Sequence, residues 1–189
     1  MSKRLRVGFD LDGVILYNPA RIIRPLVALF KKKFLKKRQY KFYVPQSKPE
    51  QLLWDIFHKS SLFVAEGFTE IEHLAKQKKI DPYIITARYD FLKKDFDLWI
   101  KKMRADTYCV DCIHNKENNQ PHLYKEEMIR KLDLDVFVED NLDIVLHLKK
   151  KFPDKTIIWI YNILDRNKPY EPKFPTLNKA ITYIKTEHL

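Results

Sequence analysis

The chain reads Val7-Gly8-Phe9-Asp10-Leu11-Asp12-Gly13-Val14 near its start. The apolar run over 5–9 predicts a buried strand, and two carboxylates separated by one residue stand where that strand ends. Asp10 is placed to act as a nucleophile and metal ligand, and Asp12 to protonate a leaving oxygen and then deprotonate water. Gly13 allows the loop to turn sharply. The stretch therefore predicts a strand that delivers two acidic groups to one site.

Short apolar runs with the composition of buried strands recur along the chain, at residues 5–9, 83–85, 107–110, 136–138 and 156–160. Segments with helical spacing of apolar residues lie between them, at 69–78, 91–103, 125–132 and 142–151. Strands that alternate with helices predict an α/β fold, here a Rossmann-like doubly wound parallel sheet. Ligands of such sheets bind beyond the carboxyl ends of the strands, so we expect the chemistry there.

Residues 15–66 interrupt this alternation with a mostly helical stretch that is basic and aromatic. We interpret it as a small helical cap inserted after the first strand, with a catalytic core formed by residues 1–14 and 67–189. The aromatic side chains of Tyr17, Tyr40 and Trp54 either form the cap's own core or stack on a substrate. The sequence leaves both interpretations open.

Two further strand ends carry polar residues. Thr86-Ala87-Arg88 follows the strand at 83–85, where a hydroxyl and backbone N–H groups can grip phosphoryl oxygens. Glu139 and Asp140 follow the strand at 136–138 and form a second acidic cluster opposite Asp10. A carboxylate attacks a phosphate only when negative charge is neutralised, and Mg²⁺ prefers such oxygen ligands. The pattern therefore predicts substrate binding at 86–88 and a magnesium site formed by the two acidic clusters.

The same chemistry needs a cationic side chain. Lys125, at the start of the helical segment 125–132, is the candidate that we favour. Lys116 is the alternative, because it follows the predicted strand residues 113–115. Each motif alone has a structural explanation as a turn or a helix cap, but their shared position after apolar strands favours a common site.

These motifs resemble those of a known group of enzymes. FDLDGV at 9–14, IITAR at 84–88, a lysine opening a helix and VFVEDN at 136–141 are similar to the four motifs of the haloacid dehalogenase superfamily. The resemblance spans most of the chain. It implies the following roles: Asp10 nucleophile, Asp12 general acid and base, Thr86 phosphate-binding hydroxyl, Lys125 neutralising cation, and Asp10, Asp140 and the Asp12 carbonyl as Mg²⁺ ligands, assisted by Glu139. Asp143 would act through water or cap the following helix.

The resemblance also implies a reaction. Asp12 distinguishes phosphatases from the superfamily's dehalogenases, which lack an aspartate at that position and need no magnesium. We therefore expect a Mg²⁺-dependent phosphatase with an aspartyl-phosphate intermediate. The run at 157–162 resembles that of 5'(3')-deoxyribonucleotidases, so the expected substrate is a phosphorylated small molecule such as a nucleoside monophosphate. A phosphatase of polynucleotide ends, and a non-catalytic protein of this fold that binds nucleic acid or a partner, remain as alternatives.

The composition bounds the class of protein. The chain has 36 Lys and Arg against 25 Asp and Glu, and much of this excess of positive charge lies between residues 31 and 41. This charge favours anionic partners, including nucleic acid at the basic cap. A hydrophobic content of 45% excludes a disordered chain. Because acidic residues break the first apolar run, we expect no signal peptide, no membrane span and a cytoplasmic location.

Overall fold

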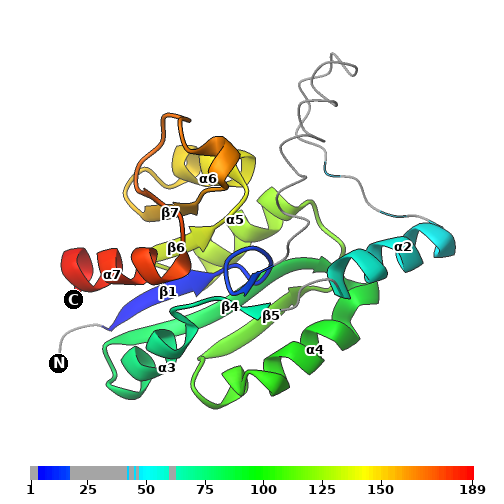
Figure 1. Ribbon diagram of the computed structural model, residues 1–189, viewed down its shortest axis with the longest axis horizontal. Coiled ribbons are helices and arrows are strands. Elements are labelled where there is room, and N and C mark those ends of the chain that lie inside the picture. Colours follow the sequence, from blue (N-terminus) through cyan, green and yellow to red (C-terminus); the bar gives the residue numbers. More distant parts are fainter. Residues whose placement is uncertain (1–3, 18–41, 43–44, 46, 60–62) are drawn as a thin grey trace.

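A parallel sheet forms the centre of the computed structural model, which describes residues 4–17, 42, 45, 47–59 and 63–189. Within these residues the sheet has six strands in the order β5-β4-β1-β6-β7-β8. They are β1 (Leu5–Phe9), β4 (Ile80–Tyr89), β5 (Asp111–Asn115), β6 (Val136–Glu139), β7 (Thr156–Ile160) and β8 (Lys173–Phe174). β1 lies between β4 and β6, so the Asp10 loop leaves the middle of the sheet (Figure 1). The predicted doubly wound α/β fold is confirmed.

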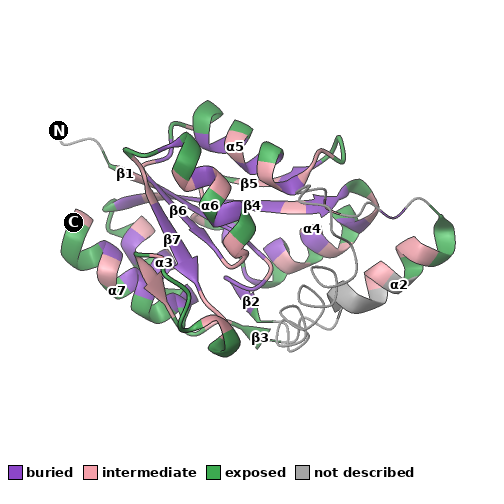
Figure 2. Cartoon of the chain, turned by 90° about the horizontal axis from the view of Figure 1, so that it is seen from above, coloured by how far each residue is buried: buried purple, intermediate pink, exposed green. Residues whose placement is uncertain are grey.

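Helices cover both faces of the sheet. One face packs against α3 (Phe68–Lys76), α4 (Lys93–Lys102) and α7 (Leu177–His188), and the other against α5 (Pro121–Lys131) and α6 (Leu142–Lys151). Neighbouring strand residues alternate between the two apolar clusters: Val136 and Val138 belong to the first, and Phe137 to the second. Because both faces of the sheet are covered, the inner strands are mostly apolar, and Figure 2 shows β6, β7 and much of β4 in the colour of buried residues.

Two predicted elements differ from the structure. The strand expected at 107–110 is wrong: the chain turns at Arg104 (φ 53°), forms a 3-10 helix over Ala105–Thr107, and begins to pair with β4 only at Asp111. The apolar residues that suggested this strand, Tyr108 and Cys109, instead pack against the core from a loop. The helix expected to open at Lys125 begins at Pro121, whose missing N–H and fixed φ suit the first helical turn. Lys125 therefore lies inside the helix.

The two ends of the predicted cap meet in a short two-stranded antiparallel sheet. β2 (Leu16–Tyr17) pairs with β3 (Phe63–Val64) in antiparallel register, and α2 (Lys48–Lys59) precedes β3. Ile15 and Leu16 are fully buried in the same apolar cluster as β1. Residues 18–41, including Tyr40, lie outside the described residues. The division of the chain into a core and a cap at 15–66 therefore stays a prediction.

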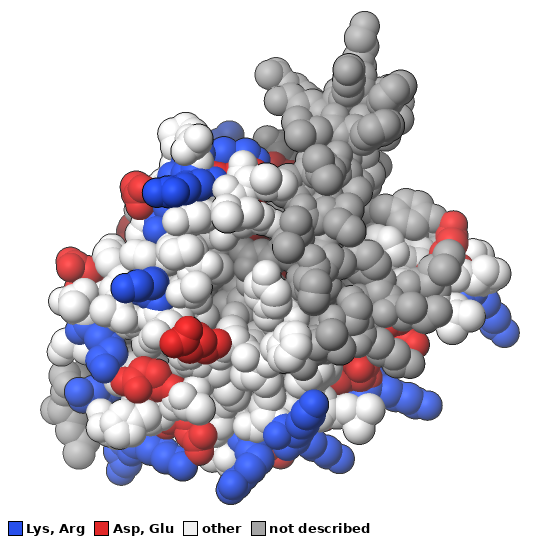
Figure 3. Space-filling view, viewed as in Figure 1, with Lys and Arg blue, Asp and Glu red and all other residues white. Residues whose placement is uncertain are grey.

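The surface offers two further observations. No helix among the described residues is long and apolar enough to cross a membrane. Figure 3 shows Lys and Arg side chains interspersed with Asp and Glu on the described part of one face, rather than gathered in one patch. The basic run at 31–41 lies outside the described residues. Binding of nucleic acid through this run remains an expectation from the sequence.

Candidate active site

Five polar residues are buried where β1, β4 and β6 end and α5 packs against the sheet: Asp10, Thr86, Arg88, Lys125 and Glu139. Charged side chains are seldom buried unless they are paired, because removing them from water is costly. Parallel pairing places the three strand ends side by side, as the predicted sheet requires. The tertiary fold thus gathers most of the residues that the sequence singled out.

Lys125 holds two of these carboxylates. Its Nζ lies 3.0 Å from Oδ1 of Asp10 and also donates to Oε2 of Glu139. The other oxygen of Glu139 accepts hydrogen bonds from the backbone N–H groups of Asp140 (3.0 Å) and Asn141 (2.8 Å). Lys116, the alternative lysine, is exposed after β5. Of the two candidate lysines, Lys125 is therefore the one that contacts Asp10.

The electrostatics of this group are unbalanced. Burial and the neighbouring carboxylates of Glu139, Asp140 and Asp12 raise the pKa of Asp10 well above its usual range, and Lys125 acts against them. Burial acts to lower the pKa of Lys125, but Asp10 and Glu139 outweigh it and raise that pKa, so the lysine stays charged. Among the residues that the structure describes, this group holds more carboxylates than cations. A bound cation would relieve this imbalance.

Three carboxylates converge in a way that suits a hard cation. Asp10, Glu139 and Asp140 each offer an oxygen, and these oxygens lie within 4.8 Å of one another. Gly13 (φ 84°) lies against this group: a Cβ there would stand 2.2 Å from Oδ2 of Asp140, so only glycine fits. Trp159 donates its indole N–H to the backbone oxygen of Asp140 (3.0 Å) and fixes the loop. The donor set therefore fits Mg²⁺, which takes oxygen ligands.

A second buried cation, Arg88, faces the other aspartate of the motif. Its Nε donates to Oδ2 of Asp12 (2.8 Å), its Nη2 to Oδ1 of Asp12 (2.7 Å), and its Nη1 to Asp95 in the first turn of α4. The sequence pattern assigns Arg88 to the substrate-binding group and does not single out Asp95. An acidic residue in the first turn of a helix was the available signal, but Asp90 and Asp97 fit the sequence pattern equally well.

The remaining motif residues lie around these two clusters. The Thr86 hydroxyl is buried where the pairing of β4 with β5 shifts its register, and it accepts a hydrogen bond from the backbone N–H of Arg88 (3.2 Å). Ala87 is half-buried and packs against the core. The cap of α6 is Asn141, whose side chain accepts from the backbone N–H of Asp143 (3.0 Å). Asp143 is therefore not the capping residue.

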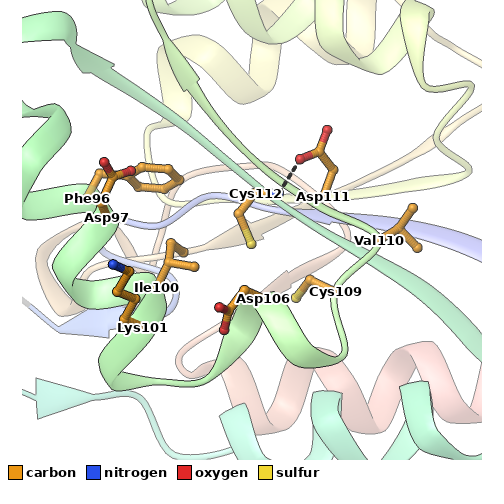
Figure 4. A pocket seen from close by; sticks show the side chains of 9 residues that line it. All are labelled: Phe96, Asp97, Ile100, Lys101, Asp106, Cys109, Val110, Asp111 and Cys112. Carbon is orange, nitrogen blue, oxygen red and sulfur yellow. Dashed lines mark hydrogen bonds between the residues drawn. The ribbon is translucent and has the colours of Figure 1, made fainter.

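A separate pocket of about 360 Å³ lies between α4 and the start of β5 (Figure 4). The free thiols of Cys109 and Cys112 line it, and both are half-buried. The hydrogen bond between the two thiols, together with burial, raises the pKa of Cys109, so its thiol stays protonated. None of the residues that line this pocket belongs to the site described above.

No protein-family model matches the chain, and no curated protein matches it in sequence. Several solved structures match it in fold, with TM-scores near 0.6 and coverage of nearly the whole of both chains. CbbY from Rhodobacter sphaeroides, in complex with phosphate, is 12% identical over 94% of this chain and 96% of its own, with a TM-score of 0.60. A Thermotoga maritima protein described as a β-phosphoglucomutase is 14% identical over 97% and 99%, with a TM-score of 0.61.

The HAD-type hydrolase YfnB from Bacillus subtilis, bound to magnesium, is 12% identical over 97% of this chain and 100% of its own, with a TM-score of 0.61. Identities this low establish the fold alone. The sequence resemblance and the structural likeness nevertheless point to the same group of proteins. The chain has the fold of the haloacid dehalogenase superfamily hydrolases.

Proposed function

We propose that the chain is a Mg²⁺-dependent phosphatase that hydrolyses phosphomonoesters through an aspartyl-phosphate on Asp10. The observation that carries the proposal is the arrangement around Asp10: Lys125 lies 3.0 Å from its carboxylate, and oxygens of Glu139 and Asp140 converge beside it. A phosphatase-type fold of the haloacid dehalogenase superfamily supports it. A nucleophilic carboxylate needs nearby positive charge to approach a phosphate, and this site supplies one cation and a place for another.

The reaction has two balanced steps. In the first, an Asp10 oxygen forms a bond to phosphorus, the bond to the leaving oxygen breaks, and Asp12 gives its proton to that oxygen. In the second, Asp12 takes a proton from water, and the resulting hydroxide attacks phosphorus. The bond to Asp10 then breaks, which releases inorganic phosphate and restores the carboxylate. Thr86 and the backbone N–H groups beside it would hold the phosphoryl oxygens, and Lys125 would neutralise their charge.

Asp10, Asp140 and the backbone carbonyl of Asp12 would hold the metal. Glu139 would assist without being a principal ligand, because its oxygens already accept hydrogen bonds from Lys125 and from two backbone N–H groups. When bound, Mg²⁺ supplies positive charge to the phosphoryl oxygens and offsets the excess of carboxylates. We therefore expect both metal binding and activity to depend on Asp10 and Asp140.

The substrate that we propose is a small phosphorylated molecule with a planar ring, such as a nucleoside monophosphate. The support is the two-stranded sheet of β2 and β3. Its strand β2 continues directly from the Asp10 loop and is tied to it by a hydrogen bond from Gly13 N to Leu16 O (2.8 Å). Tyr17 and Phe63 form a cross-strand pair in this two-stranded sheet, and they remain 43% and 61% exposed. Exposed aromatic rings beside a phosphate site suit a base or another flat leaving group.

The test measures phosphate release from nucleoside monophosphates, sugar phosphates and a 3'-phosphorylated oligonucleotide, with Mg²⁺ or with EDTA. Asp10→Asn is compared with Asp97→Asn, a matched change in the exposed Asp97–Lys93 pair on α4. We expect release that needs Mg²⁺, survives in Asp97→Asn and is lost in Asp10→Asn. Phosphate release by folded Asp10→Asn at the native rate would refute the nucleophile, and a preference for the oligonucleotide would replace the proposed substrate class.

A further inference from the structure

Arg88 is one of the most deeply buried charges in the part of the chain that the structure describes, at 3% exposure. All three of its guanidinium nitrogens are engaged: two donate to the two oxygens of Asp12, at 2.8 and 2.7 Å, and the third donates to Asp95. Burial alone would lower the pKa of Arg88, but the two carboxylates raise it, so the guanidinium is charged. One further N–H remains on each Nη, but every nitrogen of the guanidinium already donates to one of the two carboxylates.

The two-point contact restricts Asp12 more than a single ion pair would. A guanidinium is planar and rigid, and a bidentate pair defines both the position and the plane of the carboxylate. A lysine ammonium, by contrast, attracts a carboxylate as a point charge and leaves its plane free. The fork of Arg88 therefore fixes the rotamer of the Asp12 side chain.

Arg88 is itself held from several sides. Asp95 anchors Nη1 from the first turn of α4, and the backbone N–H of Arg88 donates to the Thr86 hydroxyl oxygen (3.2 Å). The guanidinium thus connects the β1 loop, β4 and α4. A rigid supporting layer of this kind is what a proton-transferring carboxylate needs, because an error of about 1 Å in its position costs on the order of 100-fold in rate.

Stability alone is a weak reason to bury Arg88 between two carboxylates. The cost of removing them from water generally cancels most of their attraction, and apolar residues of similar size are often as stabilising. The cluster nevertheless lies beside the proposed nucleophile, where the orientation of Asp12 matters. The geometry favours a role in the reaction over a purely structural one.

We propose that Arg88 is a positioning residue for Asp12, and that Asp95 positions Arg88. The guanidinium fork holds the Asp12 carboxylate in the orientation that serves both the leaving oxygen and the attacking water, and it does not bind the phosphoryl group itself. The inference rests on the proposed function, since it requires that Asp12 exchanges protons during the reaction. It assigns Arg88 and Asp95 roles different from direct substrate binding.

The test is a double-mutant cycle with p-nitrophenyl phosphate as the probe. Arg88→Lys and Asp95→Asn are each made with Asp12 intact and with Asp12→Asn, and kcat and KM are measured with Mg²⁺. With Asp12 intact we expect Arg88→Lys to lower kcat about 10- to 100-fold and to leave KM within about threefold. In the Asp12→Asn background the same change should lower kcat by less than about threefold, because the group that Arg88 positions is already gone.

Asp95→Asn should behave in the same way with a smaller loss of about 3- to 10-fold in kcat, and it leaves Arg88 paired with Asp12. Asp97→Asn, on the same helix, is the control and should change neither constant. An equal loss of kcat in both Asp12 backgrounds would show a merely structural role and overturn the proposal. A rise in KM without a fall in kcat would overturn it in favour of direct substrate binding.

The outcomes also separate this inference from the proposed function. If Asp10→Asn and Asp12→Asn both abolish turnover of a preferred substrate while Arg88→Lys has no effect, only the positioning role fails. If Asp10→Asn retains full activity, the phosphatase proposal fails whatever Arg88 does. Should Arg88→Lys fold poorly, as judged by circular dichroism and thermal unfolding, Asp95→Asn decides the result because it preserves the guanidinium.

Discussion

Lys125 and Arg88 are each buried between two carboxylates, and each contacts one aspartate of the pair Asp10 and Asp12. The lysine makes one contact to each partner, whereas the arginine makes two to Asp12. A lysine on a helix can lie close to a developing charge, and an arginine fork fixes a plane. The difference indicates that the protein neutralises one aspartate and orients the other.

The largest expected effect comes from removing Lys125 from the lysine cluster, which consists of Lys125, Asp10 and Glu139. Lys125→Met leaves Asp10 and Glu139 buried without their cation, which should lower the free energy of unfolding by about 3–5 kcal/mol. Phosphatase activity should fall at least about 1,000-fold, because the phosphoryl charge loses its neutralising partner. Urea unfolding and phosphate release measure the two effects.

The matched control is Lys116→Met, which removes the exposed lysine that the sequence alone left as the alternative. Its free energy of unfolding should change by less than about 0.5 kcal/mol, and its activity by less than about twofold. A large loss of activity in this control, with Lys125→Met still active, would reverse the assignment of the two lysines.

The acidic side of the lysine cluster can be disturbed through Gly13. An alanine there has a strained φ, and its Cβ meets Oδ2 of Asp140, so Gly13→Ala should displace Asp140 and weaken Mg²⁺ binding by about 10- to 100-fold. Gly67→Ala is the control, because it combines a similar φ (99°) with a close approach to Asn178 away from the carboxylates. Both variants should lose roughly 2 kcal/mol of stability.

Only Gly13→Ala should change the affinity for Mg²⁺. Titration of the ion against the fluorescence of the protein is suitable, since Trp159 donates to the backbone of Asp140. Equal Mg²⁺ affinities in the two glycine variants would show that Asp140 is not a ligand.

The stability of the protein should change in opposite directions when Asp10, beside Lys125, or Asp12, beside Arg88, loses its charge. The pKa of Asp10 is raised in the folded protein, chiefly by burial, so the folded state binds its proton more tightly than the unfolded chain does. Without metal, the contribution of Asp10 to stability should therefore be fully present below about pH 4 and be lost as the pH rises through the raised pKa. Asp10→Asn should abolish this loss and be more stable than the native chain at pH 8 in EDTA, by roughly 1 kcal/mol.

Asp12→Asn should instead lower the stability of the protein. It leaves the Arg88 fork with a neutral partner, and the expected loss is about 1–3 kcal/mol at the same pH. Thermal unfolding of both variants between pH 5 and 8 compares the signs. Destabilisation of the metal-free protein by Asp10→Asn would mean that the Lys125 pair outweighs burial and the neighbouring carboxylates.

The smallest expected effect on stability comes from a cluster of ion pairs at the surface, around Glu126 on α5. Glu126 contacts His147 at 2.7 Å, Arg130 at 3.3 Å and Lys151 at 3.8 Å. Burial acts to raise the pKa of Glu126, but these partners outweigh it and lower the pKa. The contribution of Glu126 to the stability of the folded protein is therefore present above about pH 4.3 and lost as the pH falls through the lowered pKa.

Glu126→Gln should cost less than about 1 kcal/mol at pH 7, because partly exposed ion pairs contribute little. Chemical unfolding between pH 3 and 7 should show a shallower loss of stability on acidification than in the native chain. A loss as large as that of Lys125→Met would contradict the distinction between the buried and the surface clusters.

Local pattern was sufficient for much of the fold. β1, β6, β7 and α6 agree with the expected elements within one residue, because an apolar run between polar boundaries specifies a buried strand or helix locally. The strand predicted at 107–110 is wrong because Tyr108 and Cys109 are apolar for packing rather than for pairing. The predicted start of α5 lies four residues late, although Pro121 is a signal for the first helical turn.

The sequence by itself determined that carboxylates stand at the ends of the apolar runs of β1 and β6 and that a threonine follows the apolar run 83–85, because order along the chain and strand periodicity are local properties. Only the tertiary structure placed Lys125, rather than Lys116, in contact with Asp10, and only it paired Arg88 with Asp12 and Asp95. These contacts join residues 14 to 115 positions apart in the chain, apart from the short step from Arg88 to Asp95. Such pairings depend on how α4 and α5 pack against the sheet, which no local pattern specifies.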